Sequence, residues 1–377
     1  MVKGGEFVNS ISIYDKTSSF SGIYVFFLVN RLQMLYFLFI MPTILTHPYM
    51  IWGIILVGML SQLNLMVLSK WVSSDYASKG YQGFVQIFGE SLVRLFTFFG
   101  VILMLVKVVV LTLGYVEIIH LLVFPSMNAN WLVVFIMVIC CYVASLGMSN
   151  SIRFVVIAFL CTIWMIVLFY PFFFPEIASL HDLYPLVPTE WSKESWRGLL
   201  LIWSSFSGPE YIVCLVPWLK SKENLVRYFT YANTLSVLEY VLLFMGSLFF
   251  FGSEYLSKSK FPVATMAKYL QTPVFERIDI IMVSLQVFNL VFAVSIFLLC
   301  IYGAYRIIRK KSQNQPTRKG LQFTCLVLIV GLIATNKWIW QEDHQSLLLN
   351  LQIWCGSFTY LLVPSLLFIS SKRKGRM

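Results

Sequence analysis

The feature that most constrains this chain is a series of apolar segments that recur along its whole length, each about 18 residues or longer. A segment of that length can cross the hydrocarbon core of a bilayer as a helix. Charged residues make up only 12% of the 377 residues, whereas soluble domains carry about a quarter. The sequence therefore predicts an all-α polytopic membrane protein.

We predict about ten transmembrane helices, which form a single integral membrane domain over residues 1–377. No connection between them is long enough for a soluble domain. Two connections are expected to hold a short helix of their own, one at 72–93 and one at 253–276, where Pro262 begins it. The approximate spans are 19–42, 49–70, 94–122, 131–148, 153–174, 198–218, 230–252, 277–305, 320–340 and 347–370.

The positions of the lysines and arginines predict the orientation. With the N-terminus in the cytoplasm, inside segments carry 19 of them and outside segments carry seven, while Arg31 and Lys107 lie within spans. This bias predicts that both termini are cytoplasmic. It also accounts for the net charge of +11 without any nucleic acid. The basic tail at 371–377 is expected to touch anionic membrane lipids.

The stretch LIWSSFSGPEYIV (Leu201–Val213) interrupts the sixth span. Pro209 lacks an N–H and crowds the carbonyl of Ser205, and Gly208 is a poor helix former. The first span is also irregular, so the two halves of five spans each begin with an interrupted helix. We therefore predict a five-plus-five inverted repeat with broken helices 1 and 6, and a ligand site between them. A plain proline kink is the alternative.

Five ionisable side chains lie within the spans, and each is costly to place in hydrocarbon. Most must therefore face the bundle interior and pair. Arg31 and Glu210 lie at similar depth and are our first candidate pair. Lys107 and Glu239 are each better explained as one half of a structural ion pair that holds two helices together, and Glu117 fits either role equally.

Nothing in the sequence predicts an enzyme. The histidines are scattered, the seven cysteines lie in apolar runs without metal-ligand spacing, and no phosphate-binding loop or catalytic triad is present. We therefore expect no metal, no cofactor and no catalytic residues.

Three segments carry a resemblance to a known family: QMLYFLFIMP from Gln33, the Gly-Pro-Glu at 208–210, and FPVATMAKYLQTPVFERIDIIMV from Phe261. Through them the chain resembles the B subunits of spore germination receptors of endospore-forming bacteria, within the amino acid–polyamine–organocation transporter superfamily. The residues that fit the family pattern are Gln33, Pro42, Phe261, Pro262, Arg277 and Asp279.

The chain departs from that family at three positions. Leu35 and Phe37 stand where the family has a glycine pair, and Gln286 stands where a tryptophan is usual. Glycine lets a backbone approach a ligand closely, so the two bulky side chains predict a smaller or differently shaped pocket.

The resemblance implies a nutrient-sensing subunit in the spore inner membrane, acting with A and C subunits on a small-molecule germinant that is amino-acid-like or nucleoside-like. A secondary transporter for an amino acid or polyamine is the alternative, and a scaffold subunit with a degenerate pocket is a third. In that superfamily spans 1, 3, 6 and 8 line the site. The ligand-binding residues that we predict are Arg31, Gln33, Glu117, Ser207, Gly208, Pro209, Glu210, Gln286 and Asn289.

Overall fold

The computed structural model describes residues 13–16, 19–174, 184–187, 192–219, 224–270, 277–311, 314–341 and 344–374. Parts of three predictions lie outside these residues: the N-terminus, 271–276 of the second short-helix connection, and 375–377 of the basic tail.

Nearly all of the described chain is helical, with one isolated bridge between Phe20 and Leu219. The helices are α1 (Gly22–Gln33), α2 (Phe37–Ile44), α3 (Met50–Val72), α4 (Asp75–Ser78), α5 (Tyr81–Phe88), α6 (Glu90–Leu122), α7 (Ala129–Ser145), α8 (Met148–Ile163), α9 (Met165–Leu168), η1 (Tyr170–Phe173), α10 (Lys193–Ser205), η3 (Pro209–Cys214), η4 (Val216–Trp218), α11 (Leu225–Leu256), α12 (Pro262–Tyr269), α13 (Ile278–Ile308), α14 (Arg318–Thr335), η5 (Asn336–Trp340) and α15 (Gln345–Lys374).

Within the described residues, seven helical segments are long and apolar enough to cross a membrane. The pair α1 and α2, bent by 47° at a short break, adds an eighth if it forms one span. This confirms an all-α polytopic membrane protein. The other two spans of the predicted ten fall on α7, an apolar helix of 17 residues, and on α10 with η3 and η4. The count of ten and the inverted repeat stay predictions.

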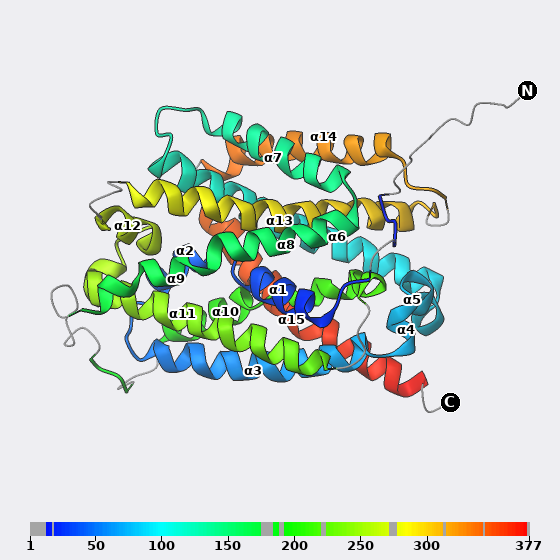
Figure 1. Cartoon of the computed structure of the whole chain (residues 1–377), viewed down its shortest axis with the longest axis horizontal. Coiled ribbons are helices and arrows are strands. Elements are labelled where there is room, and N and C mark those ends of the chain that lie inside the picture. The colour runs from blue at the N-terminus through cyan, green and yellow to red at the C-terminus, as the bar shows by residue number, and fades with distance from the viewer. Residues whose placement is uncertain are drawn as a thin grey trace, which may run out of the picture.

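Helix α13 runs through the middle of the bundle, where it packs against α6, α7 and α8 (Figure 1). Its most apolar stretch is 72% buried, more than that of any other long apolar helix described. A helix that is apolar on all sides is suited to such a position, because it leaves no polar face to satisfy. Helices α3, α7 and α14 expose large apolar side chains on their outer faces, as a surface that faces lipid requires.

The short helices gather at the two ends of the bundle (Figure 1). Helices α4 and α5 lie at the same end as the C-terminal end of α15, and α12 lies at the opposite end. The short helices expected in 72–93 and 253–276 are confirmed as α5 and as α12, which begins at Pro262. This arrangement is the one expected if α4 and α5 are cytoplasmic and α12 is outside.

Candidate functional site

Two helix interruptions meet in the interior. Helix α1 ends at Gln33 and α2 begins at Phe37, while α10 ends at Ser205 and η3 begins at Pro209. Between the latter two, Gly208 has φ +145°. A Cβ at Gly208 would lie 2.5 Å from the backbone oxygen of Leu32, so the two breaks are in direct backbone contact. The predicted break at Gly208–Pro209 is confirmed, and only glycine fits there.

Side chains from three other helices satisfy the backbone carbonyls that the breaks release. The Tyr240 hydroxyl donates to the carbonyl of Gln33 at 2.7 Å, and the Asn289 amide donates to the carbonyl of Met34. The Lys107 ammonium donates to the carbonyl of Ser207 at 2.8 Å. Hydrocarbon tolerates an opened helix only when such partners exist. Lys107 and Asn289 therefore hold the two breaks open.

Glu210 is buried beside the second break. One carboxylate oxygen accepts a hydrogen bond from the backbone N–H of Gly208, and the other accepts from the Thr359 hydroxyl at 3.2 Å. The Lys107 ammonium lies 5.3 Å from the centre of the Tyr211 ring. Glu210 thus caps the backbone that the second break opens.

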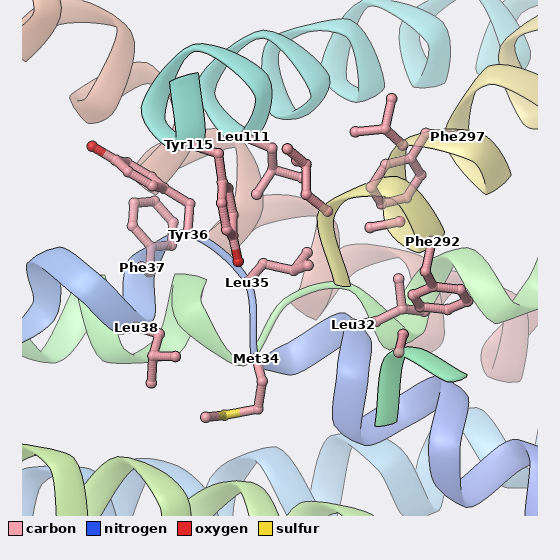
Figure 2. Close-up of a cluster of buried hydrophobic side chains, with 14 of the residues drawn as sticks. Leu32, Met34, Leu35, Tyr36, Phe37, Leu38, Leu111, Tyr115, Phe292 and Phe297 are labelled. Atoms are coloured by element: carbon pink, nitrogen blue, oxygen red, sulfur yellow. The ribbon is translucent and has the colours of Figure 1, made fainter. Parts of the chain in front are cut away.

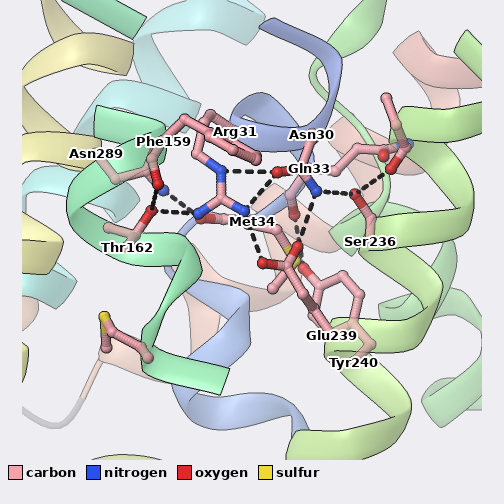
Figure 3. Close-up of polar contacts among 12 residues, drawn as sticks. Asn30, Arg31, Gln33, Met34, Phe159, Thr162, Ser236, Glu239, Tyr240 and Asn289 are labelled. Carbon is pink, nitrogen blue, oxygen red and sulfur yellow. Dashed lines mark hydrogen bonds and ion pairs between the residues drawn. The ribbon is translucent and has the colours of Figure 1, made fainter. Parts of the chain in front are cut away.

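Arg31 belongs to a separate cluster, and the predicted pair with Glu210 is wrong (Figure 3). The guanidinium forms an ion pair with Glu239 at 2.7 Å and donates to Asn30 and to the Thr162 hydroxyl. It also lies over the Phe159 ring, at 5.1 Å from the ring centre. These contacts tie α1 to α8 and α11.

The Arg31 cluster is closed by further hydrogen bonds. The Asn30 amide donates to the second carboxylate oxygen of Glu239 at 2.8 Å and to the Ser236 hydroxyl at 2.9 Å. Arg31 and Glu239 are both almost fully buried. The structural interpretation of Glu239 is confirmed, because both of its oxygens serve to join helices.

A small cavity lies where the two breaks meet, with a volume of about 20 Å³. That volume holds about one water molecule, whereas ligand pockets measure about 300–1,000 Å³. Figure 2 shows Leu35 beside Leu111 and Phe37 beside Tyr36, in the space next to the first break. The residues that line the cavity are Gln33, Leu35, Tyr36, Phe37, Lys107, Val110, Leu111, Ser204, Ser205, Ser207 and Gln352.

Gln352 on α15 lines the cavity but is not among the residues predicted from the sequence. Its side chain is buried, and its Oε1 has no hydrogen-bond partner among the described residues. Gln352, Gly356 and Thr359 are spaced by four and three residues, so they share one helix face. At Gly356, an added Cβ would lie 2.5 Å from the Ser204 hydroxyl oxygen. This spacing of a glutamine, a glycine and a threonine in the last span could have predicted a polar helix face from the sequence.

The predicted ligand-binding residues fall into separate groups. Ser207, Gly208, Pro209 and Glu210 surround the second break, with Gln33 and Asn289 at the first. Arg31 points into its own cluster, as described above.

Two further predicted residues lie apart from the cavity. Gln286 contacts the sulfur of Met165 at 3.5 Å. Glu117 lies toward the α12 end, where it accepts hydrogen bonds from Lys260, from the Trp340 indole and from the Gln345 amide. No group of metal-ligating side chains occurs within the ranges that the structure describes.

Comparison with known proteins identifies the family. A family model described as spore germination protein matches residues 25–344, which include both helix breaks and the Arg31 cluster. The chain belongs to the spore germination protein family. Spore germination protein GerQB of Bacillus cereus is 27% identical over 175 residues, which are 46% of this chain. That match spans 48% of GerQB, about half its length. The family resemblance carried by the sequence motifs is confirmed.

Proposed function

We propose that this protein is the B subunit of a spore germinant receptor and that it senses a small nutrient between its two helix breaks. The observation that supports this most is the cavity at their contact, where polar groups converge on opened backbone. The polar residues Lys107, Ser204, Ser205, Ser207 and Gln352 all line it. Backbone opened beside a cavity is a recurrent way for membrane proteins to bind small polar molecules.

The nutrient would have to select an expanded conformation, since the cavity holds about one water molecule. Leu35, Tyr36 and Phe37 form the wall that must move. A ligand that binds only the expanded state shifts the equilibrium toward it, which is the property that a receptor needs. The chemistry fits a polar molecule that is amino-acid-like or nucleoside-like.

The alternative function is a secondary transporter for an amino acid or polyamine. Leu35 and Phe37 line the small cavity and leave little room for a substrate. The Lys107 ammonium donates to the Ser207 carbonyl, which a cationic substrate would otherwise use, so this contact disfavours a carrier of cationic substrates. An uptake assay with labelled amino acids and polyamines separates the two functions, because a receptor predicts no accumulation above background.

We place the protein in the spore inner membrane with both termini in the cytoplasm, in a complex with A and C subunits. The excess of lysine and arginine at the end that holds α4, α5 and the end of α15 supports this orientation. A reporter fused after residue 377 should read cytoplasmic, and an external reading would overturn the orientation.

The test is germination of spores that lack the gene, measured against a panel of single amino acids, nucleosides and sugars. Loss of the response to one nutrient class is expected, with restoration by the wild-type gene. Gln352→Leu is the decisive variant. It removes a buried oxygen that has no partner among the described residues, so protein abundance should hold or rise while the response falls.

Gln62→Leu is the matched control. Gln62 also carries a buried Oε1 without a partner in the described part of the chain, but its amide binds Thr230 and it does not line the cavity. Spores that carry Gln62→Leu should germinate in response to the nutrient as wild-type spores do. An unchanged nutrient response of Gln352→Leu spores at normal protein abundance would show that the nutrient does not bind at this cavity.

A further inference from the structure

A second cavity lies away from the helix breaks. It is a groove of about 500 Å³ between α7 and α14. Leu321 and Cys325 form its buried floor, whereas Val138, Tyr142 and Leu326 on its rim are each more than half exposed. The groove therefore opens sideways, onto the surface that faces the bilayer in a membrane protein.

The groove has one polar end and one apolar end. Ser145, Arg318 and Gln322 line the polar end, near the start of α14, and the deeper part is lined by aliphatic side chains and cysteines. Arg318 is exposed, and no acidic residue in the described ranges lies within ion-pair distance of it.

The same end of α14 carries further groups that attract anions. The first backbone N–H groups of α14 point toward this end, which favours a negative charge there. Lys319 follows Arg318, and α13 ends next to it, since Tyr302 donates a hydrogen bond to the carbonyl of Thr317 at 3.0 Å. Arg306 and Arg309 therefore lie at this end too. The polar end of the groove combines an arginine, a helix N-terminus and a basic surrounding.

The length of the groove decides whether a lipid or a transmembrane helix of a partner subunit fits it better. Arg318 and Ile329, which both line it, are eleven residues apart on α14, or about 16 Å along the helix axis. One leaflet of a bilayer has about 15 Å of hydrocarbon, half of the total core. A transmembrane helix of a partner subunit would need an apolar contact surface through both leaflets.

We propose that this groove binds one phospholipid with an anionic headgroup. An acyl chain lies along Leu321, Cys325 and Ile329, and the phosphate of the headgroup accepts hydrogen bonds from the Arg318 guanidinium. Arginine suits this role because its planar donors bind phosphate in a bidentate manner. The site is specific for the leaflet on which α14 begins.

The experiment compares purified full-length protein in detergent after addition of short-chain phosphatidylglycerol or phosphatidylcholine. For wild type, phosphatidylglycerol should raise the melting temperature more than phosphatidylcholine does. Arg318→Gln should bind phosphatidylglycerol roughly fivefold more weakly and leave phosphatidylcholine binding unchanged, since one basic group near an anionic headgroup is worth that factor. Arg153→Gln is the matched control, an exposed arginine on α8 outside the groove.

A second variant tests the apolar part of the groove. Leu326→Trp places a large ring on the rim and should weaken binding of both lipids, with the apo melting temperature kept because the side chain is exposed. Equal effects of the two lipids on wild type, or an Arg318→Gln protein that keeps the phosphatidylglycerol preference, would overturn the proposal. So would lipid binding that Leu326→Trp leaves intact, because the groove would then hold no acyl chain.

Discussion

The molecule has two buried polar clusters, one around Arg31 and one at the second helix break, and they differ in how completely their polar atoms are hydrogen-bonded. The Arg31 cluster joins an ion pair to amide and hydroxyl partners, and both oxygens of Glu239 are used. The cluster at the second break has a void beside it and an amide oxygen on Gln352 without a partner in the described residues. The polar atoms of the Arg31 cluster are bonded to one another, so this cluster serves to hold helices together. The cluster at the second break still has a hydrogen-bond acceptor that a ligand could use.

This difference shows that a charge buried in a membrane protein is not by itself the sign of a binding site. Arg31 and Lys107 are equally unusual in the sequence, and both are buried. Arg31 has a carboxylate partner at 2.7 Å and ties helices together, whereas Lys107 is bonded to a carbonyl released by a helix break. Whether a buried charge is structural or can serve a binding site therefore depends on the partners that it has in the folded protein.

The largest expected effect comes from breaking the closed cluster. Arg31→Ala should cost about 3–5 kcal/mol of folding free energy, because Glu239 is then buried without its partner. Arg31→Ala combined with Glu239→Ala should recover much of that loss, as measured by thermal unfolding and by abundance in the membrane. Lys258→Ala is the control, since its pair with Glu254 is solvent-exposed and contributes little. Coupling of Arg31 to Glu210 in place of Glu239 would contradict the assignment of the pair.

A smaller effect is expected at the contact between the two breaks. Gly208→Ala should cost about 1–3 kcal/mol from its backbone conformation alone, with the Leu32 carbonyl as an additional clash. The measurement is protein abundance together with the midpoint of thermal unfolding. Gly331→Ala on α14 is the matched control, since an added Cβ there has no atom within 4 Å. Equal abundance and equal unfolding midpoints of the two variants would contradict both the constrained backbone at Gly208 and the contact between the breaks.

The smallest effect on stability is expected for Lys107→Met. The carbonyl of Ser207 loses its donor, but the cost of burying an ammonium disappears as well. Glu210 keeps its hydrogen bonds from the Gly208 N–H and the Thr359 hydroxyl, so the net loss should be about 1 kcal/mol. The nutrient response per molecule should fall much further than abundance does. Lys337→Met, at an exposed lysine on η5, should change neither. A loss of stability as large as that of Arg31→Ala would mean that Lys107 has a structural role like that of Arg31. The two clusters would then not differ in function.

Much of the architecture was readable from the sequence because it depends on local chemistry. Long apolar runs must be helical in lipid, since every backbone group has to be satisfied within the segment. Gly208 and Pro209 are adjacent poor helix formers, so a break at this point could be predicted from two residues, with a plain proline kink as the alternative. Pro262 begins α12 for an equally local reason, because its missing N–H costs nothing at the first helical position.

The partners of the buried charges were decided only by the tertiary structure. Residues two apart on a helix point about 200° from each other, so Arg31 and Gln33 on α1 serve different surroundings. The rotation of α1 turns Arg31 toward Glu239 on α11 and sets Gln33 on the cavity, and no local pattern specifies that rotation. Gln352 enters the site from the last helix for the same reason. Packing between helices distant in sequence selects which polar atoms meet, and it leaves the Gln352 oxygen without a partner in the described residues.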